Sequence, residues 1–314
     1  MTSLLPLATS TIQPIVVDFA INFLGWATTI FIGSGSKYYD FTGSLAFIIT
    51  NIYSHTHGSG TSLIRQRIAT GMIVIWSARL GIFLFNRILK HGGIDKRVEK
   101  HVNNHQRFFT MWFLQGVWVM MNSLPILTLN AHGKTMTTPL TILDGIQIVS
   151  YLLGLTLQII ADEQKSNFNV KNKGRYITTG LWKYCQHPNY FAEFLIHSSI
   201  ALFCAPALFQ GTLSQKLVVF SPLFEILLIR YVSGVPILQN DGMKKWGKEP
   251  DYLLYRKNTS LLVPWPWHVT NEVVTTVSSS RLGSGGGGGG TTPSKNRSRS
   301  RSSKTATMAQ RRGK

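Results

Sequence analysis

The stretch Gly180–His197, GLWKYCQHPNYFAEFLIH, decides the fold of this chain and its candidate site. Pro188 has no N–H to donate and a fixed φ, so it predicts the first turn of a helix that continues into an apolar run. At about 100° per residue, four polar side chains share one face of that helix: Asn189, Tyr190, Glu193 and His197. An acid on a helix that enters a membrane is costly unless it meets a partner or a wet cavity. This face therefore predicts a functional site, and the alternative is a local cluster in which Glu193 bonds only His197.

The composition is that of a membrane protein. Hydrophobic residues make up 44% of the 314 residues and charged residues only 14%, which is too apolar for an ordinary soluble domain. Most of the apolar runs approach the roughly 20 residues that a helix needs to cross a bilayer. The runs are Pro14–Ile32, Phe41–Tyr53, Ile68–Leu89, Phe108–Leu129, Leu140–Ile160, Tyr190–Phe209 and Lys216–Leu238. We expect an all-α, multi-pass transmembrane helical bundle of about seven spans, in which the 13-residue second run is the doubtful one.

Basic residues alternate between successive loops. Lys90–Arg107 and Ala161–Asn189 each hold five Lys or Arg residues, whereas Asn130–Pro139 holds one. Cytosolic loops of membrane proteins carry an excess of Lys and Arg. The alternation predicts that the two basic loops and the C-terminus are cytosolic, and that the N-terminus is luminal or external.

The chain divides into a transmembrane domain, 1–268, and a Gly/Ser/Arg-rich tail, 269–314, that the composition predicts to be disordered. The net charge is +19, and nine of the Lys and Arg residues follow Ser280. This basic tail fits contact with anionic membrane lipids. Nucleic acid is not an expected partner, because no aromatic residues interleave the charges. Two cysteines, Cys185 and Cys204, are too few for a disulfide framework.

Two charged residues lie within predicted spans. Arg79 is near the middle of the third run, with Trp76 and Asn86 on nearly the same helix face. An arginine at that depth needs a carboxylate, a phosphate or water, so we expect an internal polar site there. The alternative is a structural ion pair with Asp18 or Glu225. Asp18, in the first run, is a candidate by the same reasoning, unless it lies at the membrane interface.

Two further sets of polar residues fall at cytosolic positions. Gln158, Asp162 and Lys165 repeat at i, i+4 and i+7, so they share a helix face that leads out of the membrane. That face is either part of a site or a solvated helix end. Beyond the last span, Tyr252 and Arg256 stack on one side of a short predicted helix.

Several motifs in order resemble one known family. WSARLGIFLFNRI, GGIDKR, ADEQKSNF, GLWKYCQHPNYFAE, SGVPIL and PDYLLYRKNTSLLVPW resemble the steroid 5-alpha-reductase-like membrane proteins, in the branch filed as domain of unknown function 1295. The resemblance covers roughly residues 12 to 268. It implies a multi-pass enzyme of lipid metabolism in the endoplasmic reticulum, which uses NADPH to reduce a carbon–carbon double bond conjugated to a ketone.

The resemblance also implies roles for individual residues. The residues implied to hold the cofactor are Asp162, Asn189, Glu193, Tyr252 and Arg256, and Arg79 matches an arginine that also reaches it. Trp76 stands about where steroid reductases carry a Tyr that polarises the substrate ketone, and an indole is only an N–H donor. The catalytic Glu of those reductases has no clear counterpart, and Asp18 is the candidate. The catalytic set is therefore Arg79, Trp76 and Asp18, with no metal.

The first functional hypothesis is thus an NADPH-dependent oxidoreductase acting on CH–CH groups of a lipid-like or sterol-like enone. The second is an isoprenylcysteine-type methyltransferase that uses S-adenosylmethionine, since those enzymes share a similar HPxY helix start. They usually carry a pair of acids before the closing Tyr segment, where this chain reads SGVPILQNDG. The third is a non-catalytic membrane lipid-binding protein of the same fold. The sequence leaves open the substrate and the oligomeric state.

Overall fold

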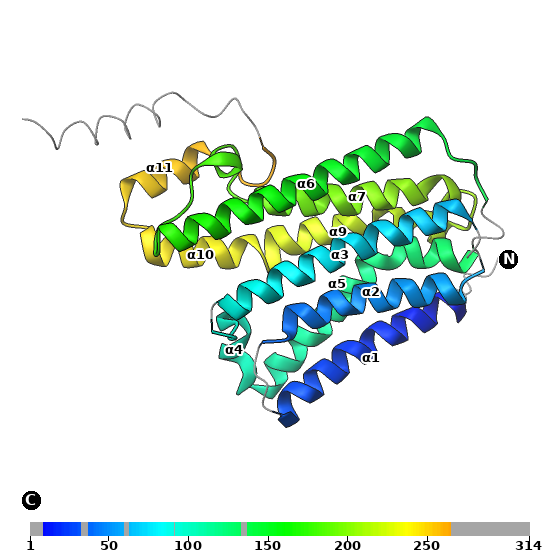
Figure 1. The fold of residues 1–314 in the computed structure, drawn as a ribbon, viewed down its shortest axis with the longest axis horizontal. Helices are drawn as coiled ribbons and strands as arrows, with labels where there is room; N and C mark the ends of the chain where they lie inside the picture. The colour runs from blue at the N-terminus through cyan, green and yellow to red at the C-terminus, as the bar shows by residue number, and fades with distance from the viewer. Residues whose placement is uncertain (1–8, 33–36, 60–62, 91, 133–136, 265–314) are drawn as a thin grey trace, which may run out of the picture. The chain divides into compact units, whose positions relative to one another are not determined.

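The computed structural model describes residues 9–32, 37–59, 63–90, 92–132 and 137–264, and these form helices without a β-sheet (Figure 1). The predicted all-α fold is confirmed. The division at residue 268 stays a prediction, because the tail lies outside the described residues.

A helix forms over each predicted apolar run. The long ones are α1 (Thr9–Ile32), α2 (Tyr39–His57), α3 (Ile64–Lys90), α5 (His105–His132), α6 (Ile142–Lys171) and α7 (Pro188–Leu208). The last run folds as consecutive short elements: α8 (Leu213–Leu217), η2 (Val218–Phe220), α9 (Ser221–Leu227), η3 (Leu228–Val232) and α10 (Val235–Trp246). Short helices α4 (Lys96–Val102), η1 (Gly180–Lys183) and α11 (Pro250–Asn258) lie in the connections and after the last run. Within the described residues, six helices are long and apolar enough to cross a membrane: α1, α3, α5, α6, α7 and the composite Leu213–Trp246.

The doubtful second run forms a full helix, α2, of 19 residues, which corresponds to about 28 Å. It packs against α1, α3 and α5, and its buried face includes Ser44, Thr50, Asn51 and Ser54. Asn51 Nδ2 donates a hydrogen bond to Ser123 Oγ of α5 at 2.9 Å. The weak hydropathy of α2 thus reflects a polar face that is buried in the bundle.

The contact between α6 and α7 brings together the two helices that carry Asp162, Asn189 and Glu193. It depends on Gly154, where a Cβ would lie 2.9 Å from Ile196 Cγ1 and 3.2 Å from the Ala192 carbonyl oxygen. At the far end, Asp144 caps α6 through Thr141 and forms a buried ion pair with Arg65 of α3. These contacts fix the relative register of α3, α6 and α7.

The two basic loops lie at the same end of the bundle. Figure 1 shows α4, the start of α7 and the α10–α11 connection at one end, and the start of α1 at the other. The alternation of charge in the sequence is therefore matched by the positions of the loops.

Candidate functional site

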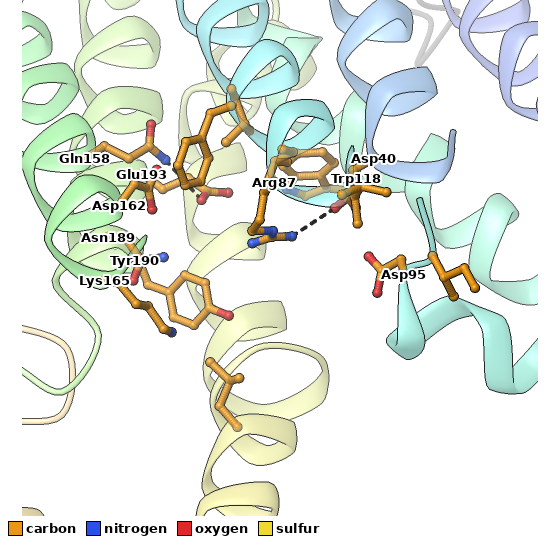
Figure 2. Close-up of a pocket in the computed structure, with 16 residues that line it drawn as sticks. Asp40, Arg87, Asp95, Trp118, Gln158, Asp162, Lys165, Asn189, Tyr190 and Glu193 are labelled. Carbon is orange, nitrogen blue, oxygen red and sulfur yellow. Dashed lines mark hydrogen bonds and ion pairs between the residues drawn. The ribbon is translucent and has the colours of Figure 1, made fainter. Parts of the chain in front are cut away.

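A pocket of about 540 Å³ lies among α3, α6, α7 and α10, at the end of the bundle that carries the basic loops (Figure 2). Its polar lining is Asp40, Arg87, Asp95, Gln158, Asp162, Lys165, Asn189, Tyr190 and Glu193. Its other lining residues are Leu80, Phe83, Leu84, Ile88, Ile94, Trp118 and Leu238. Figure 2 shows the α6 and α7 side chains on one side and Arg87, Asp40 and Asp95 across from them. The pocket thus combines an apolar wall with a set of charged side chains.

The two helix faces predicted from periodicity meet in this pocket. Gln158, Asp162 and Lys165 all line it from α6, so their shared face is confirmed as part of a cavity. Asn189, Tyr190 and Glu193 line it from α7. The helix begins at Pro188 as predicted, and this start places Asn189 and Tyr190 in the first turn, where they line the pocket.

Arg79 is linked to the pocket by an ion pair with Asp162, which lines it. Its Nη1 donates to Asp162 Oδ2 at 2.8 Å, with side-chain exposures of 17% and 10%, and its guanidinium lies 5.1 Å over the Phe83 ring. The carboxylate that pairs with Arg79 is therefore on α6, and neither alternative, Asp18 or Glu225, takes this place. Asn86 is exposed, so the prediction that it shares an interior site with Arg79 is wrong.

Trp76 is fully buried behind the pocket wall. Its Nε1 donates to Gln158 Oε1 at 3.0 Å, and Gln158 Nε2 donates to Glu193 Oε2 at 3.4 Å. Because an indole can only donate, it fixes the orientation of the Gln158 amide, with oxygen toward Trp76 and NH₂ toward Glu193. Trp76 acts on the pocket by orienting these side chains.

Asp18 lies elsewhere in the bundle. It is fully buried on α1, where Asn22 Nδ2 donates to its Oδ1 at 2.8 Å. Gln115 Nε2 of α5 in turn donates to Asn22 Oδ1 at 2.9 Å. Asp18 is not among the pocket residues, so its catalytic role stays a prediction that its position does not support.

Tyr252 and Arg256 belong to a lobe of aromatic residues at the basic end. The Tyr252 ring packs against Tyr176 and Trp246, at centroid distances of 4.8 and 5.5 Å. Arg256 lies 5.9 Å over the Tyr252 ring. Tyr255 Oη of the lobe donates a hydrogen bond to the Trp182 carbonyl oxygen of η1 at 2.7 Å. Trp182 Nε1 in turn donates to the Ala161 carbonyl oxygen at 3.1 Å, which ties the lobe to α6. Tyr252 and Arg256 do not line the pocket itself.

His187, directly before α7, is a neighbour of the pocket that the sequence reasoning missed. It is buried, and neither ring nitrogen has a hydrogen-bond partner. Burial, together with the nearby charges of Lys165 and Arg256, lowers the pKa of His187 to about 3. Its ring stacks on Tyr190 with a centroid distance of 5.4 Å. Arg256 Nε is also buried without a partner, so both His187 ring nitrogens and Arg256 Nε have unused hydrogen-bonding capacity.

The sequence reasoning also missed Arg87, whose Nη2 lies 3.4 Å from Asp40 Oδ2. Arg87 follows Arg79 by eight residues, which places it about 80° away on the same helix. That spacing was a signal that could have found it. Asp40 carried no such signal, because it meets the pocket only through the packing of α2.

A family model described as "Protein of unknown function (DUF1295)" matches residues 25–259. The chain belongs to this family. The DUF1295 region runs from within α1 to the residue after α11 and so includes every pocket residue, whereas Asp18 precedes it. The resemblance that the motifs indicated is confirmed at the level of the family. Comparisons with curated proteins and with solved structures gave no match.

Proposed function

We propose that this DUF1295 protein is a membrane-embedded, NADPH-dependent reductase of a carbon–carbon double bond in a lipid-like or sterol-like enone. The observation that carries the proposal is the convergence of Asn189 and Glu193 with the Arg79–Asp162 pair at one pocket. An amide, an acid and a paired arginine at the start of a helix suit a nicotinamide ring with its carboxamide and a nearby phosphate.

His187, which stacks on the pocket residue Tyr190, and Arg256 fit the phosphates of such a cofactor. The nitrogens of His187 and Arg256 Nε are buried without hydrogen-bond partners, which costs about 1–3 kcal/mol for each unsatisfied group. A phosphate next to His187 would accept hydrogen bonds from the one N–H of the neutral ring and from Arg256 Nε, and it would lie beside the positive charge of Lys165. Arg256 would thus serve the cofactor from outside the pocket, and Tyr252 would position it.

In the proposed mechanism, the bound cofactor supplies a hydride and the chain's residues orient the reactants. Asn189 offers both a donor and an acceptor to the carboxamide, and Glu193 accepts a hydrogen bond from it. The apolar wall, with Leu80 and Phe83, holds a lipid-like substrate and excludes water. The pocket lies at the end that carries the basic loops, so we propose that it is reached from the cytosol, that the C-terminus is cytosolic and that the bundle lies in the endoplasmic reticulum membrane.

The test is a titration of NADPH against the purified protein in detergent, with four variants of the chain. Glu193→Gln and Asn189→Ala should each weaken binding by about 1–3 kcal/mol, the size of one hydrogen bond to a charged or amide group. Cys185→Ser is the matched control, because the Cys185 thiol is buried against the Leu262 carbonyl oxygen and does not line the pocket. His187→Asn should weaken NADPH binding more than NADH binding.

Equal NADPH affinity in the Asn189, Glu193 and Cys185 variants would contradict the assignment of the pocket. Tight binding of S-adenosylmethionine instead of NADPH would point to a methyltransferase of the same fold.

A further inference from the structure

Two buried polar side chains face each other within the bundle, outside the set of residues that lines the pocket. His197 of α7 and Glu225 of α9 have side-chain exposures of 1% and 0%, and His197 Nε2 lies 3.6 Å from Glu225 Oε1. Neither ring nitrogen and neither carboxyl oxygen has a hydrogen-bond partner among the described residues. Buried polar groups are normally hydrogen-bonded, so this pair has the bonding capacity to hold a ligand.

The separation of the two groups fits one bridging oxygen atom. A direct N–H···O hydrogen bond spans about 2.7–3.2 Å, so Nε2 and Oε1, at 3.6 Å, are too far apart for a good one. Polar groups at such a separation are commonly joined by an oxygen that bonds both. An oxygen placed about 2.8 Å from each atom would make two hydrogen bonds at once.

A hydroxyl group matches the chemistry of both side chains. It has one hydrogen to donate to Glu225 Oε1 and lone pairs to accept from an Nε2–H of His197. A ketone oxygen can only accept, so it would leave the Glu225 carboxyl group without a donor. A metal ion fits less well, because the described residues contain no group of three or more His, Cys, Asp or Glu side chains placed to hold one.

Aromatic rings link the pair to the pocket wall. Trp76 meets the His197 ring edge-on at a centroid distance of 4.4 Å, and the Phe47 ring stacks on it at 6.2 Å. Trp118 packs on Phe47 at 4.9 Å and also lines the pocket. His197 follows the pocket residue Glu193 by four residues, or about 6 Å along α7. The pair therefore lies about one helical turn beyond the pocket lining.

We propose that His197 and Glu225 form a binding site for one hydroxyl oxygen, which bridges His197 Nε2 and Glu225 Oε1. Two sources supply such a group: a water molecule, or the hydroxyl end of a lipid alcohol whose chain lies along the apolar wall of the pocket. The lipid source requires the Trp118 side chain to turn, because its ring belongs to both the pocket wall and the aromatic cluster. The site needs no cofactor and goes beyond the proposed reductase function.

A structure of the purified wild-type protein, at a resolution that shows ordered water, tests the site. We expect one oxygen at about 2.8 Å from both His197 Nε2 and Glu225 Oε1. A direct hydrogen bond between the two side chains would overturn the proposal. So would a hydrogen bond from either side chain to another protein group, or a pair with no oxygen between its members.

A variant shows whether both side chains are needed. His197→Phe keeps a flat ring and removes both nitrogens, so the bridging oxygen should be lost. Ser199→Ala is the matched control, because Ser199 is a buried residue of the same helix whose Oγ donates to the Leu195 carbonyl oxygen at 2.7 Å. This control should keep the oxygen. An oxygen that stays in His197→Phe would overturn the proposal, and if that variant does not fold, the wild-type structure alone decides.

Dodecanol and dodecane, added to separate wild-type samples, distinguish the two sources. If the oxygen is continuous with a bound chain in dodecanol and isolated in dodecane, the site takes lipid alcohols. An isolated oxygen in both samples identifies the ligand as water. NADPH titration of the same samples keeps the two claims apart: a bridging oxygen without NADPH binding supports this site and counts against the reductase function, whereas NADPH binding without the oxygen does the reverse.

Discussion

Replacing Arg79 by Leu should destabilise the protein and abolish cofactor binding. The substitution leaves Asp162 facing the pocket without the cation that lies 2.8 Å away. Breaking a buried ion pair by removing one partner costs about 3–5 kcal/mol. Because the two side chains retain exposures of 17% and 10%, we expect a loss near the lower end, about 3 kcal/mol.

Denaturant unfolding in detergent, followed by the fluorescence of the buried tryptophans, measures this loss. The double variant Arg79→Leu/Asp162→Leu removes both charges and should recover most of the lost stability, because no unpaired charge remains. It should not recover NADPH binding. Arg87→Leu is the matched control on the same helix, since the Arg87–Asp40 pair is longer, at 3.4 Å, and its arginine is 36% exposed. That variant should lose about 0–1 kcal/mol.

A loss below about 1 kcal/mol in Arg79→Leu would show that the pair contributes no more than a surface salt bridge. Failure of the double variant to recover would show that Arg79 stabilises the fold through packing on Phe83, and the argument from charge would be refuted.

Three further predictions concern the α6–α7 contact, the orientation of the chain in the membrane and the buried ring of His187. Gly154→Ala should destabilise the α6–α7 contact by about 1–3 kcal/mol, whereas Gly145→Ala, where a Cβ meets nothing within 4 Å, should be neutral or stabilising; equal melting temperatures would refute the close-contact argument. A glycosylation sequon placed between residues 96 and 102 should stay unmodified in microsomes, because this loop is expected to be cytosolic. A sequon in a lengthened turn at Gly211 should be modified, and the reverse pair of results would show that the orientation is inverted. Burial lowers the pKa of His187 in the folded protein to about 3, from a usual value of 6.5, so stability that is present above pH 6.5 should be lost as the pH falls toward 3. In His187→Asn the free energy of unfolding should fall less steeply with falling pH. Identical slopes in the two proteins would contradict the burial of a neutral ring.

The fold was predictable because the length of an apolar run and the helical period are local properties. Pro188 placed the start of α7, and the i, i+4, i+7 spacing of Gln158, Asp162 and Lys165 placed them on one face. The second run was harder to assess, since α2 turns its polar face toward other helices and so lacks the hydropathy of a lipid-facing span.

The partners within the site were not predictable in the same way. Arg79 pairs with Asp162, 83 residues away, and the choice among three acids depends on the register in which α3 and α6 pack. Glu225 meets His197 only because the last run breaks into short elements that bring α9 against α7. His197 pairs with Glu225, whereas the local alternative required a pair between His197 and Glu193.

Equilibrium dialysis of purified wild-type protein against NADPH, NADH and S-adenosylmethionine tests the central claim most directly. The account predicts that one NADPH binds per chain, that NADH binds more weakly for lack of a phosphate next to His187, and that S-adenosylmethionine does not compete. Binding of S-adenosylmethionine with no binding of either nicotinamide cofactor would contradict it.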